Sequence, residues 1–118
     1  MQINQDQFIF LGKVPEETFA IRSAQFLVER FPEAAEAPID DVLAAVREAI
    51  QRGRSYGLRT EQDLAAYVLT SFLLGSEFDK EFPAAYEVLL SPVLAPSDKA
   101  LWLNQWTEEM FQTLSGGD

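Results

Sequence analysis

Residues 60–75, TEQDLAAYVLTSFLLG, decide the predicted fold of this 118-residue chain. Thr60, followed by Asp63, has the pattern of a helix start, in which the hydroxyl accepts an N–H and the acid reaches back. The residues that follow are apolar on several sides, which is typical of a helix at the centre of a domain. Gly75 then suits the left-handed conformation that often ends a helix. The stretch therefore predicts a central helix.

Two more helices are predicted on the N-terminal side of this stretch. Apolar residues at helical spacing follow Pro15 as far as Phe31, where the next residue is a proline that disfavours helical backbone. A loop over residues 33–38 leads to a second amphipathic helix that begins near Ile39. Residues 1–14 are predicted to form either a short helix or an extended arm.

Two helices are also predicted on the C-terminal side. A turn over residues 76–82 precedes a helix that begins with Pro83 and ends at Leu90. The last helix is predicted to begin at Ser97, whose hydroxyl is suited to the N-cap position, and to end before Gly116.

No segment shows the alternation expected of a strand. The sequence therefore predicts an all-α fold, a compact bundle of about five helices without a sheet. Hydrophobic residues make up 47% of the chain, enough for one core, so residues 1–118 are predicted to form a single helical domain.

The composition excludes several kinds of chemistry. The chain has no cysteine and no histidine, so it has no disulfide, no thiolate nucleophile, no zinc–thiolate site and no imidazole base. We expect neither a cofactor nor a metal. No apolar run approaches the roughly 18 residues of a membrane span, and the N-terminus lacks the basic start of an export signal. The predicted location is cytoplasmic.

The charge of the chain favours some partners over others. The net charge is −10, and residues 60–118 hold two bases against ten acids, whereas residues 1–59 hold seven bases against nine acids. Such a surface repels phosphates, so binding to nucleic acid or to an anionic membrane is not expected. A basic protein partner facing the later half is favoured. The alternative is that the acidity serves solubility alone.

Residues 53–57, GRSYG, match the G-x-S-x-G pattern of a hydrolase nucleophile. That motif requires a strand before the serine and a histidine elsewhere, but the preceding residues have a helical pattern and the chain contains no histidine. Gly53 would loosen the last turn of a helix and Gly57 would end it. We therefore predict that Ser55 marks a boundary between two helices and is not a nucleophile.

The acids at 77–81 alternate, as calcium ligands sometimes do. Glu77, Asp79 and Glu81 lack the spacing and the glycine of an EF-hand loop, and Lys80 interrupts them. We predict that these acids are solvated, while Phe78 and Phe82 anchor the turn to the core.

The aromatic residues of the later half include the candidates for a binding surface. Trp102 lies between two leucines, and three consecutive large apolar residues cannot all face one core. Core packing is the more ordinary role, but tryptophan and tyrosine are frequent at binding hot spots. The predicted partner-binding residues are Glu77, Phe78, Asp79, Glu81, Tyr86, Trp102 and Trp106.

The stretch 54–79, RSYGLRTEQDLAAYVLTSFLLGSEFD, resembles a small helical bacterial family encoded beside the effectors of type VI secretion clusters. The matching features are the Tyr56-Gly57 turn, the helix start over 60–63, the Gly-x-x-Phe-Asp motif over 75–79 and the proline-led helix at Pro83. The chain departs from the family at 82–86, FPAAY, where a Pro-Trp pair is expected.

The resemblance implies an accessory protein without enzymatic activity. On this reading the chain is a chaperone, co-chaperone or adaptor that holds a secreted effector, or its loading partner, encoded nearby. The first alternative is an immunity protein that neutralises a toxin, and a small carboxylate-dependent enzyme is a third and remote one. Homodimerisation through an exposed helix face stays open.

Overall fold

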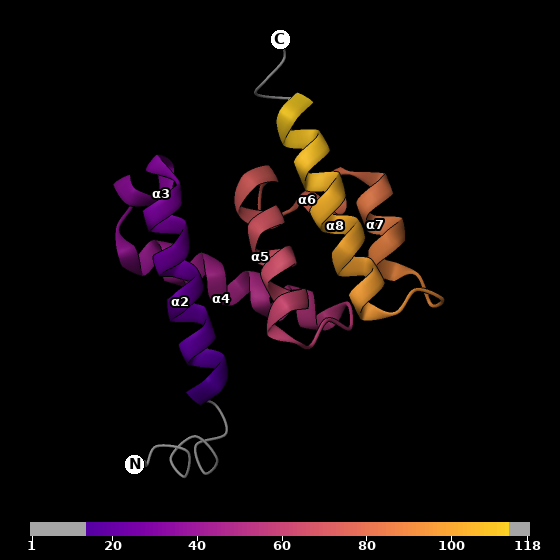
Figure 1. Cartoon of the computed structure of the whole chain (residues 1–118), viewed down its shortest axis with the longest axis horizontal. Helices are drawn as coiled ribbons and strands as arrows, with labels where there is room; N and C mark the ends of the chain where they lie inside the picture. Colours follow the sequence, from indigo (N-terminus) through magenta and orange to yellow (C-terminus); the bar gives the residue numbers. More distant parts are fainter. Residues whose placement is uncertain (1–13, 114–118) are drawn as a thin grey trace. The chain divides into compact units, whose positions relative to one another are not determined.

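The computed structural model describes residues 14–113 of the chain. These residues form seven helices and no strand (Figure 1), which confirms the predicted all-α fold. The helices are α2 (Val14–Arg30), α3 (Pro32–Glu36), α4 (Ile39–Ser55), α5 (Glu61–Leu74), α6 (Phe78–Glu81), α7 (Pro83–Leu90) and α8 (Pro96–Phe111). The short helix or arm predicted over residues 1–14 lies outside the described residues, except for the first residue of α2.

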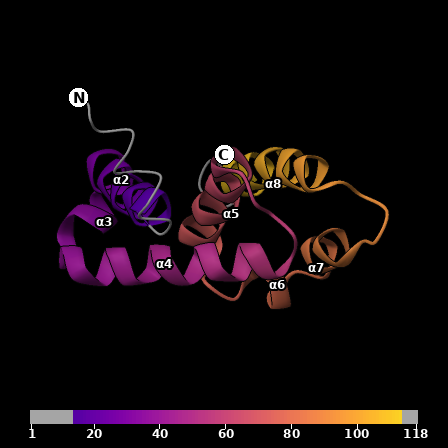
Figure 2. The ribbon, with the colours of Figure 1, turned by 90° about the horizontal axis from the view of Figure 1, so that it is seen from below.

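The chain divides into two compact units, whose boundary lies inside α4 between Val46 and Arg47. The first unit contains α2, α3 and the first part of α4, and the second contains the rest of α4 and α5 to α8. Figure 2 shows α4 as one long helix. That the whole chain forms a single domain stays a prediction.

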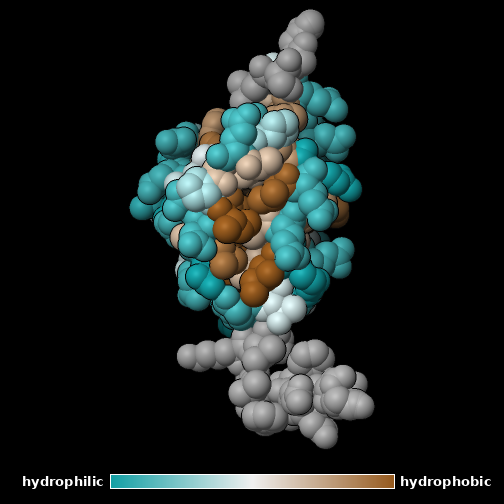
Figure 3. All heavy atoms as spheres, turned by 90° about the vertical axis from the view of Figure 1, so that its left-hand side faces the viewer, coloured by the Kyte–Doolittle hydropathy of each residue, from teal (hydrophilic) through white to brown (hydrophobic). Residues whose placement is uncertain are grey.

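In the first unit, α2 packs against α3. The buried residues of α2 recur at helical spacing and include two alanines, whose small side chains allow a neighbouring helix to approach closely. The buried apolar residues of this unit are Phe19, Ala20, Ala24, Leu27, Ala34, Val42 and Val46. Seen from the side where these helices lie, apolar side chains form a band bordered by hydrophilic ones (Figure 3).

The prediction of a loop over residues 33–38 is wrong for its first part, because residues 32–36 form α3. Pro32 occupies the first turn, where its fixed φ suits a helix and its missing N–H costs nothing. Phe31 before it has extended backbone, and the buried Ala34 fixes the turn to the rest of the unit.

In the second unit, α5 is the central helix, and its most extensive contact is with α8. Its start follows the prediction, since the backbone N–H of Asp63 donates to the Thr60 hydroxyl at 3.1 Å. The end of α5 also follows the prediction, since Gly75 comes directly after the helix with a φ of +109°. The buried residues of α5 are Asp63, Leu64, Ala66, Tyr67, Val68 and Thr70, and those of α8 are Lys99, Ala100, Leu103 and Thr107.

Two predictions for the second unit are wrong in detail. The turn predicted over 76–82 contains the short helix α6, which forms because the fully buried Phe78 holds this segment against the core. Ser97 is not the N-cap of the last helix, because α8 begins at Pro96 and its cap position is Ala95, two residues before Ser97. Proline is well suited to the first position of a helix, and here it determines the start.

Candidate functional site

The GRSYG motif lies where α4 ends, as predicted. Ser55 is the last residue of this helix, and its hydroxyl donates to the backbone oxygen of Arg52 at 2.6 Å. Gly57 follows with a φ of +95°, a conformation that residues with a side chain rarely adopt. The element before the serine is a helix and not the strand of a hydrolase, so the boundary interpretation of the motif is confirmed.

Gly53 has a different role from the predicted loosening of the helix end, because α4 continues through it. A Cβ atom at this position would lie 3.0 Å from Cδ2 of Leu64 and 3.3 Å from Cγ of Tyr67. Both neighbours are buried on α5. The glycine therefore allows α4 and α5 to pack closely at this point.

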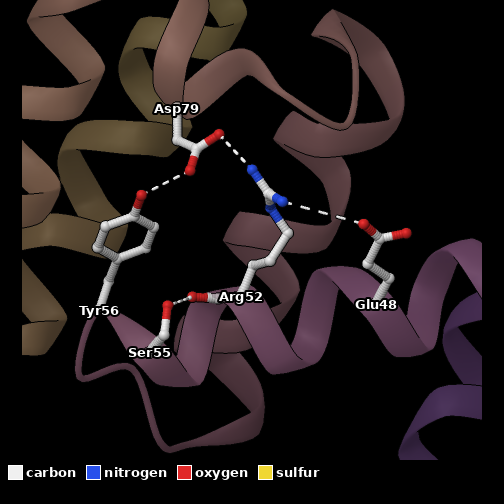
Figure 4. Close-up of polar contacts among 5 residues, drawn as sticks. All are labelled: Glu48, Arg52, Ser55, Tyr56 and Asp79. Carbon is white, nitrogen blue, oxygen red and sulfur yellow. Dashed lines mark hydrogen bonds and ion pairs between the residues drawn. The ribbon is translucent and has the colours of Figure 1, made fainter.

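A buried carboxylate joins α4 to α6, and we call Asp79, Arg52 and Tyr56 the Asp79 cluster (Figure 4). Asp79 is only 2% exposed. Its Oδ1 accepts from Nη2 of Arg52 at 2.7 Å, and its Oδ2 accepts from the Tyr56 hydroxyl at 2.5 Å. Glu48 is a weaker and more exposed neighbour, with its Oε2 3.9 Å from Nη1 of Arg52. Each oxygen of the buried carboxylate thus has its own donor.

The cluster shifts the pKa of every member. Burial alone would raise the pKa of Asp79, but the hydrogen bonds from Tyr56 and Arg52 outweigh burial and lower it below its ordinary value of 3.8. Burial raises the pKa of Tyr56, and its hydrogen bond to Asp79 raises it further. The hydrogen bond to Asp79 also raises the pKa of Arg52, against the opposing effect of burial.

These shifts favour a structural role for the cluster. A general acid or base works best when its pKa lies near the operating pH. In the Asp79 cluster the carboxylate is shifted further below neutrality and the phenol further above it, so both stay in their ordinary protonation states. The cluster is built to hold a charge, and it joins two segments that are distant in the sequence.

Lys99 holds two further segments from within the same unit. It is buried in the first turn of α8, where its Nζ donates to the backbone oxygen of Leu89 at 2.7 Å and to that of Tyr56 at 3.1 Å. Its position is a signal that sequence reasoning missed. A cation in the first turn lies at the unfavourable end of the helix dipole, which suggests that another interaction keeps it there.

A row of aromatic rings runs through the unit beside the Asp79 cluster. The Tyr67 ring lies 4.9 Å from that of Phe78 and 6.0 Å from that of Tyr56, measured between centroids. Trp106 continues the row, 6.2 Å from Phe78, and it stacks on Trp102 at 5.2 Å. Burial raises the pKa of Tyr67 to about 12, although the nearby Arg52 opposes this.

The structure separates the predicted contact residues into three groups. The side chains of Glu77, Glu81 and Tyr86 are exposed, and those of Trp102 and Trp106 are half-buried. The side chains of Phe78 and Asp79 are interior, because the first fills the core under α6 and the second bonds to Arg52 and Tyr56. This part of the prediction needs correction, since interior side chains add nothing to a contact surface. The exposed residue of the 101–103 run is Leu101, at 56%, and not Trp102.

No metal site is visible in the described residues. Asp79 turns inward onto the Asp79 cluster, whereas Glu77 and Glu81 face solvent, so the alternating acids of 77–81 do not converge on one point. Among residues 14–113, no group of three or more acidic, histidine or cysteine side chains is arranged to hold a metal ion.

Sequence reasoning also missed the exposed aliphatic residues at the end of α7 and in its connection to α8. Leu90, Val93 and Leu94 are 52%, 87% and 38% exposed. The sequence does contain a signal of this exposure, because Val93 and Leu94 lie between Pro92 and Pro96, in a segment that cannot continue a helix.

Comparisons with known proteins add no further assignment. No protein family model matches the chain, and no curated protein or solved structure matches it either. Within residues 14–113, no helix is both long enough and apolar enough to cross a membrane.

Proposed function

We propose that this chain is a non-enzymatic accessory protein that acts by binding another protein. The observation that carries the proposal is the group of large apolar side chains exposed within residues 86–101, namely Tyr86, Leu90, Val93, Leu94 and Leu101. Five such residues within 16 positions are a surplus that the folded unit does not bury. Exposed apolar patches are typical of protein–protein interaction sites, and these residues are the candidates for one.

The later half of the described chain carries mostly acidic exposed charges. Asp63, Asp79 and Lys99 are buried, so the exposed charges of residues 60–113 are seven carboxylates and a single base, Lys80. This distribution favours a partner with a basic surface, because complementary charge speeds association and disfavours wrong partners.

The resemblance of residues 54–79 to accessory proteins of type VI secretion supplies the class of partner. We infer a chaperone, co-chaperone or adaptor for a secreted effector, because a chaperone covers apolar surface and therefore needs apolar side chains of its own. The acidic surface favours an immunity protein as a second candidate, since an acidic face matches the phosphate-binding site of a nuclease toxin.

Binding to the products of the genes that flank this one tests the proposal. Each product is purified and titrated into the full chain by isothermal calorimetry, and we expect one of them to bind with a Kd of about 1 µM or tighter. An immunity role further requires that the chain inhibit the activity of the bound toxin at equimolar concentration. If no flanking product binds at micromolar concentration, the proposal is wrong.

A further inference from the structure

The connection between α7 and α8 is the most exposed apolar part of the described chain. Val93 has the largest exposed fraction of any large apolar residue described, 87%, and Leu90 and Leu94 lie within three residues of it. Figures 1 and 2 show this connection standing out from the helices that it joins. We call Leu90, Val93 and Leu94 the apolar knob.

The backbone that carries the apolar knob is held in place. The Ser91 hydroxyl accepts hydrogen bonds from the backbone N–H groups of Val93 and Leu94, both at 3.1 Å. At the start of the connection, the buried Lys99 donates to the backbone oxygen of Leu89 at 2.7 Å. A segment that is ordered before it binds loses less conformational entropy on binding, so its contacts contribute more to affinity.

The exposed charged residues that flank the apolar knob in the sequence are acidic. Glu87 lies one turn before Leu90 on α7, and Asp98 lies in the first turn of α8, both exposed. No base lies between Lys80 and Lys99 in the sequence, and the ammonium group of Lys99 is directed inward at two carbonyl oxygens. A partner surface that covers the knob therefore meets carboxylates at its edge.

We propose that the apolar knob inserts into an apolar pocket of a partner protein whose rim carries lysine or arginine. This inference rests on the proposed function and adds where the contact lies and what the partner presents. An apolar centre with a polar, solvent-accessible rim is the usual arrangement of a protein–protein interface.

A second copy of this chain is a poor occupant of the same surface. Two copies would each bring a net charge of −10, and the exposed charges of residues 60–113 are seven carboxylates and one lysine on each copy. Like charges brought together at an interface oppose association. The acidic edge of the knob therefore favours a different, basic protein.

The test uses the flanking gene product that binds the wild-type chain in calorimetry. The double variant Val93→Ser/Leu94→Ser removes the knob without changing any charge, and we expect binding to weaken by at least about tenfold. The matched control is Ile39→Ser, an exposed apolar residue of the first unit at 53%, which should bind like wild type. Unchanged binding by the double variant overturns the inference, as does an equal loss in the control.

A charge variant tests the rim of the partner's pocket. Glu87→Lys/Asp98→Lys should also weaken binding by about tenfold, with a smaller difference at high salt. Tighter binding by this variant would mean that the partner is not basic there and would overturn the inference.

The oligomeric state of the free chain is a separate test. Light scattering of the free chain must give a monomer, because a dimer lost in Val93→Ser/Leu94→Ser would assign the knob to a second copy.

The two proposals fail in distinguishable ways. If a flanking product binds the wild-type chain, Val93→Ser/Leu94→Ser and Glu87→Lys/Asp98→Lys equally, the proposed function stands and the location of the contact is wrong. If no flanking product binds the wild-type chain, the proposed function fails, and the inference that rests on it fails as well.

Discussion

The Asp79 cluster and the apolar knob belong to the same unit but differ in how their side chains are satisfied. In the cluster, a carboxylate, a guanidinium and a phenol, groups often found in active sites, bond to one another inside the chain. In the knob, three aliphatic residues without reactive groups remain exposed to solvent. The comparison indicates that the polar residues maintain the fold, and it leaves the exposed apolar ones available for the proposed contact with a partner.

The difference has an energetic side. Removing one partner of a buried ion pair leaves the other charge buried without compensation, which is strongly destabilising. Removing an exposed aliphatic side chain changes less, because a large part of that side chain is in water both before and after folding. The two regions should therefore respond to substitution in opposite ways, in stability and in binding.

The largest effect is expected from Asp79→Ala. This change leaves Arg52 without its buried carboxylate and Tyr56 without an acceptor, and we expect the free energy of unfolding to fall by about 3 kcal/mol. Urea denaturation followed by circular dichroism measures the loss. The control is Glu81→Ala, an exposed acid of the same short helix, for which we expect a change below about 0.5 kcal/mol. Equal effects of the two variants would contradict the structural role of the Asp79 cluster.

A smaller effect is expected from Tyr56→Phe. The variant removes one donor from Asp79 and leaves Oδ2 of the buried carboxylate unpaired, so the free energy of unfolding should fall by about 2 kcal/mol. Tyr86→Phe is the matched control, because Tyr86 is 43% exposed and should tolerate the loss of its hydroxyl. A wild-type stability for Tyr56→Phe would show that water replaces the hydroxyl.

The pH dependence of stability should report Asp79 as well. The folded state lowers the pKa of Asp79 below 3.8, so its contribution is present above that pH and disappears as the pH falls through the folded-state pKa. Asp79→Asn carries no charge at this position. The gap in stability between wild type and Asp79→Asn should therefore be constant above about pH 5 and shrink in more acidic solution. A gap that does not change in acid would contradict the pKa shift.

The smallest effect on stability is expected in the apolar knob. Val93→Ser/Leu94→Ser should change the free energy of unfolding by less than about 0.5 kcal/mol, although the same variant is expected to weaken binding. Thermal and urea denaturation of the free variant provide the measurement. A large loss of stability would mean that these side chains support the fold, and the contrast with the Asp79 cluster would disappear.

Local features of the sequence predicted most of the helices. Thr60, Gly75 and Pro83 determine where their helices begin or end through interactions within a few residues, and a single sequence shows these directly. The two short helices α3 and α6 depend instead on the burial of Ala34 and Phe78, and the ring of Phe78 lies beside those of Tyr67 and Trp106, which are distant in the sequence.

The candidate site was much less predictable. Arg52 and Asp79 are 27 residues apart, and Lys99 is 43 residues from the carbonyl of Tyr56 that it binds. Helical spacing carries no information on pairs at such distances. The choice of Trp102 as the contact residue rested on composition, which could not decide which of three consecutive apolar residues would be exposed. In the structure, the exposed residue of the three is Leu101.

The threonine pair inside the α5–α8 contact has a consequence for how this protein can change over generations. The Thr70 hydroxyl bonds to the Ala66 carbonyl at 2.9 Å and to the Thr107 hydroxyl at 2.6 Å. Since its one hydrogen goes to the carbonyl, Thr107 is the donor in the pair. If Thr70 is replaced first, the buried hydroxyl of Thr107 loses its acceptor. If Thr107 is replaced first, the Thr70 hydroxyl still donates to the Ala66 carbonyl and no buried donor is left without an acceptor. A descendant lineage that replaces both with valine is therefore expected to pass through Thr107→Val, and the opposite order is expected to be selected against.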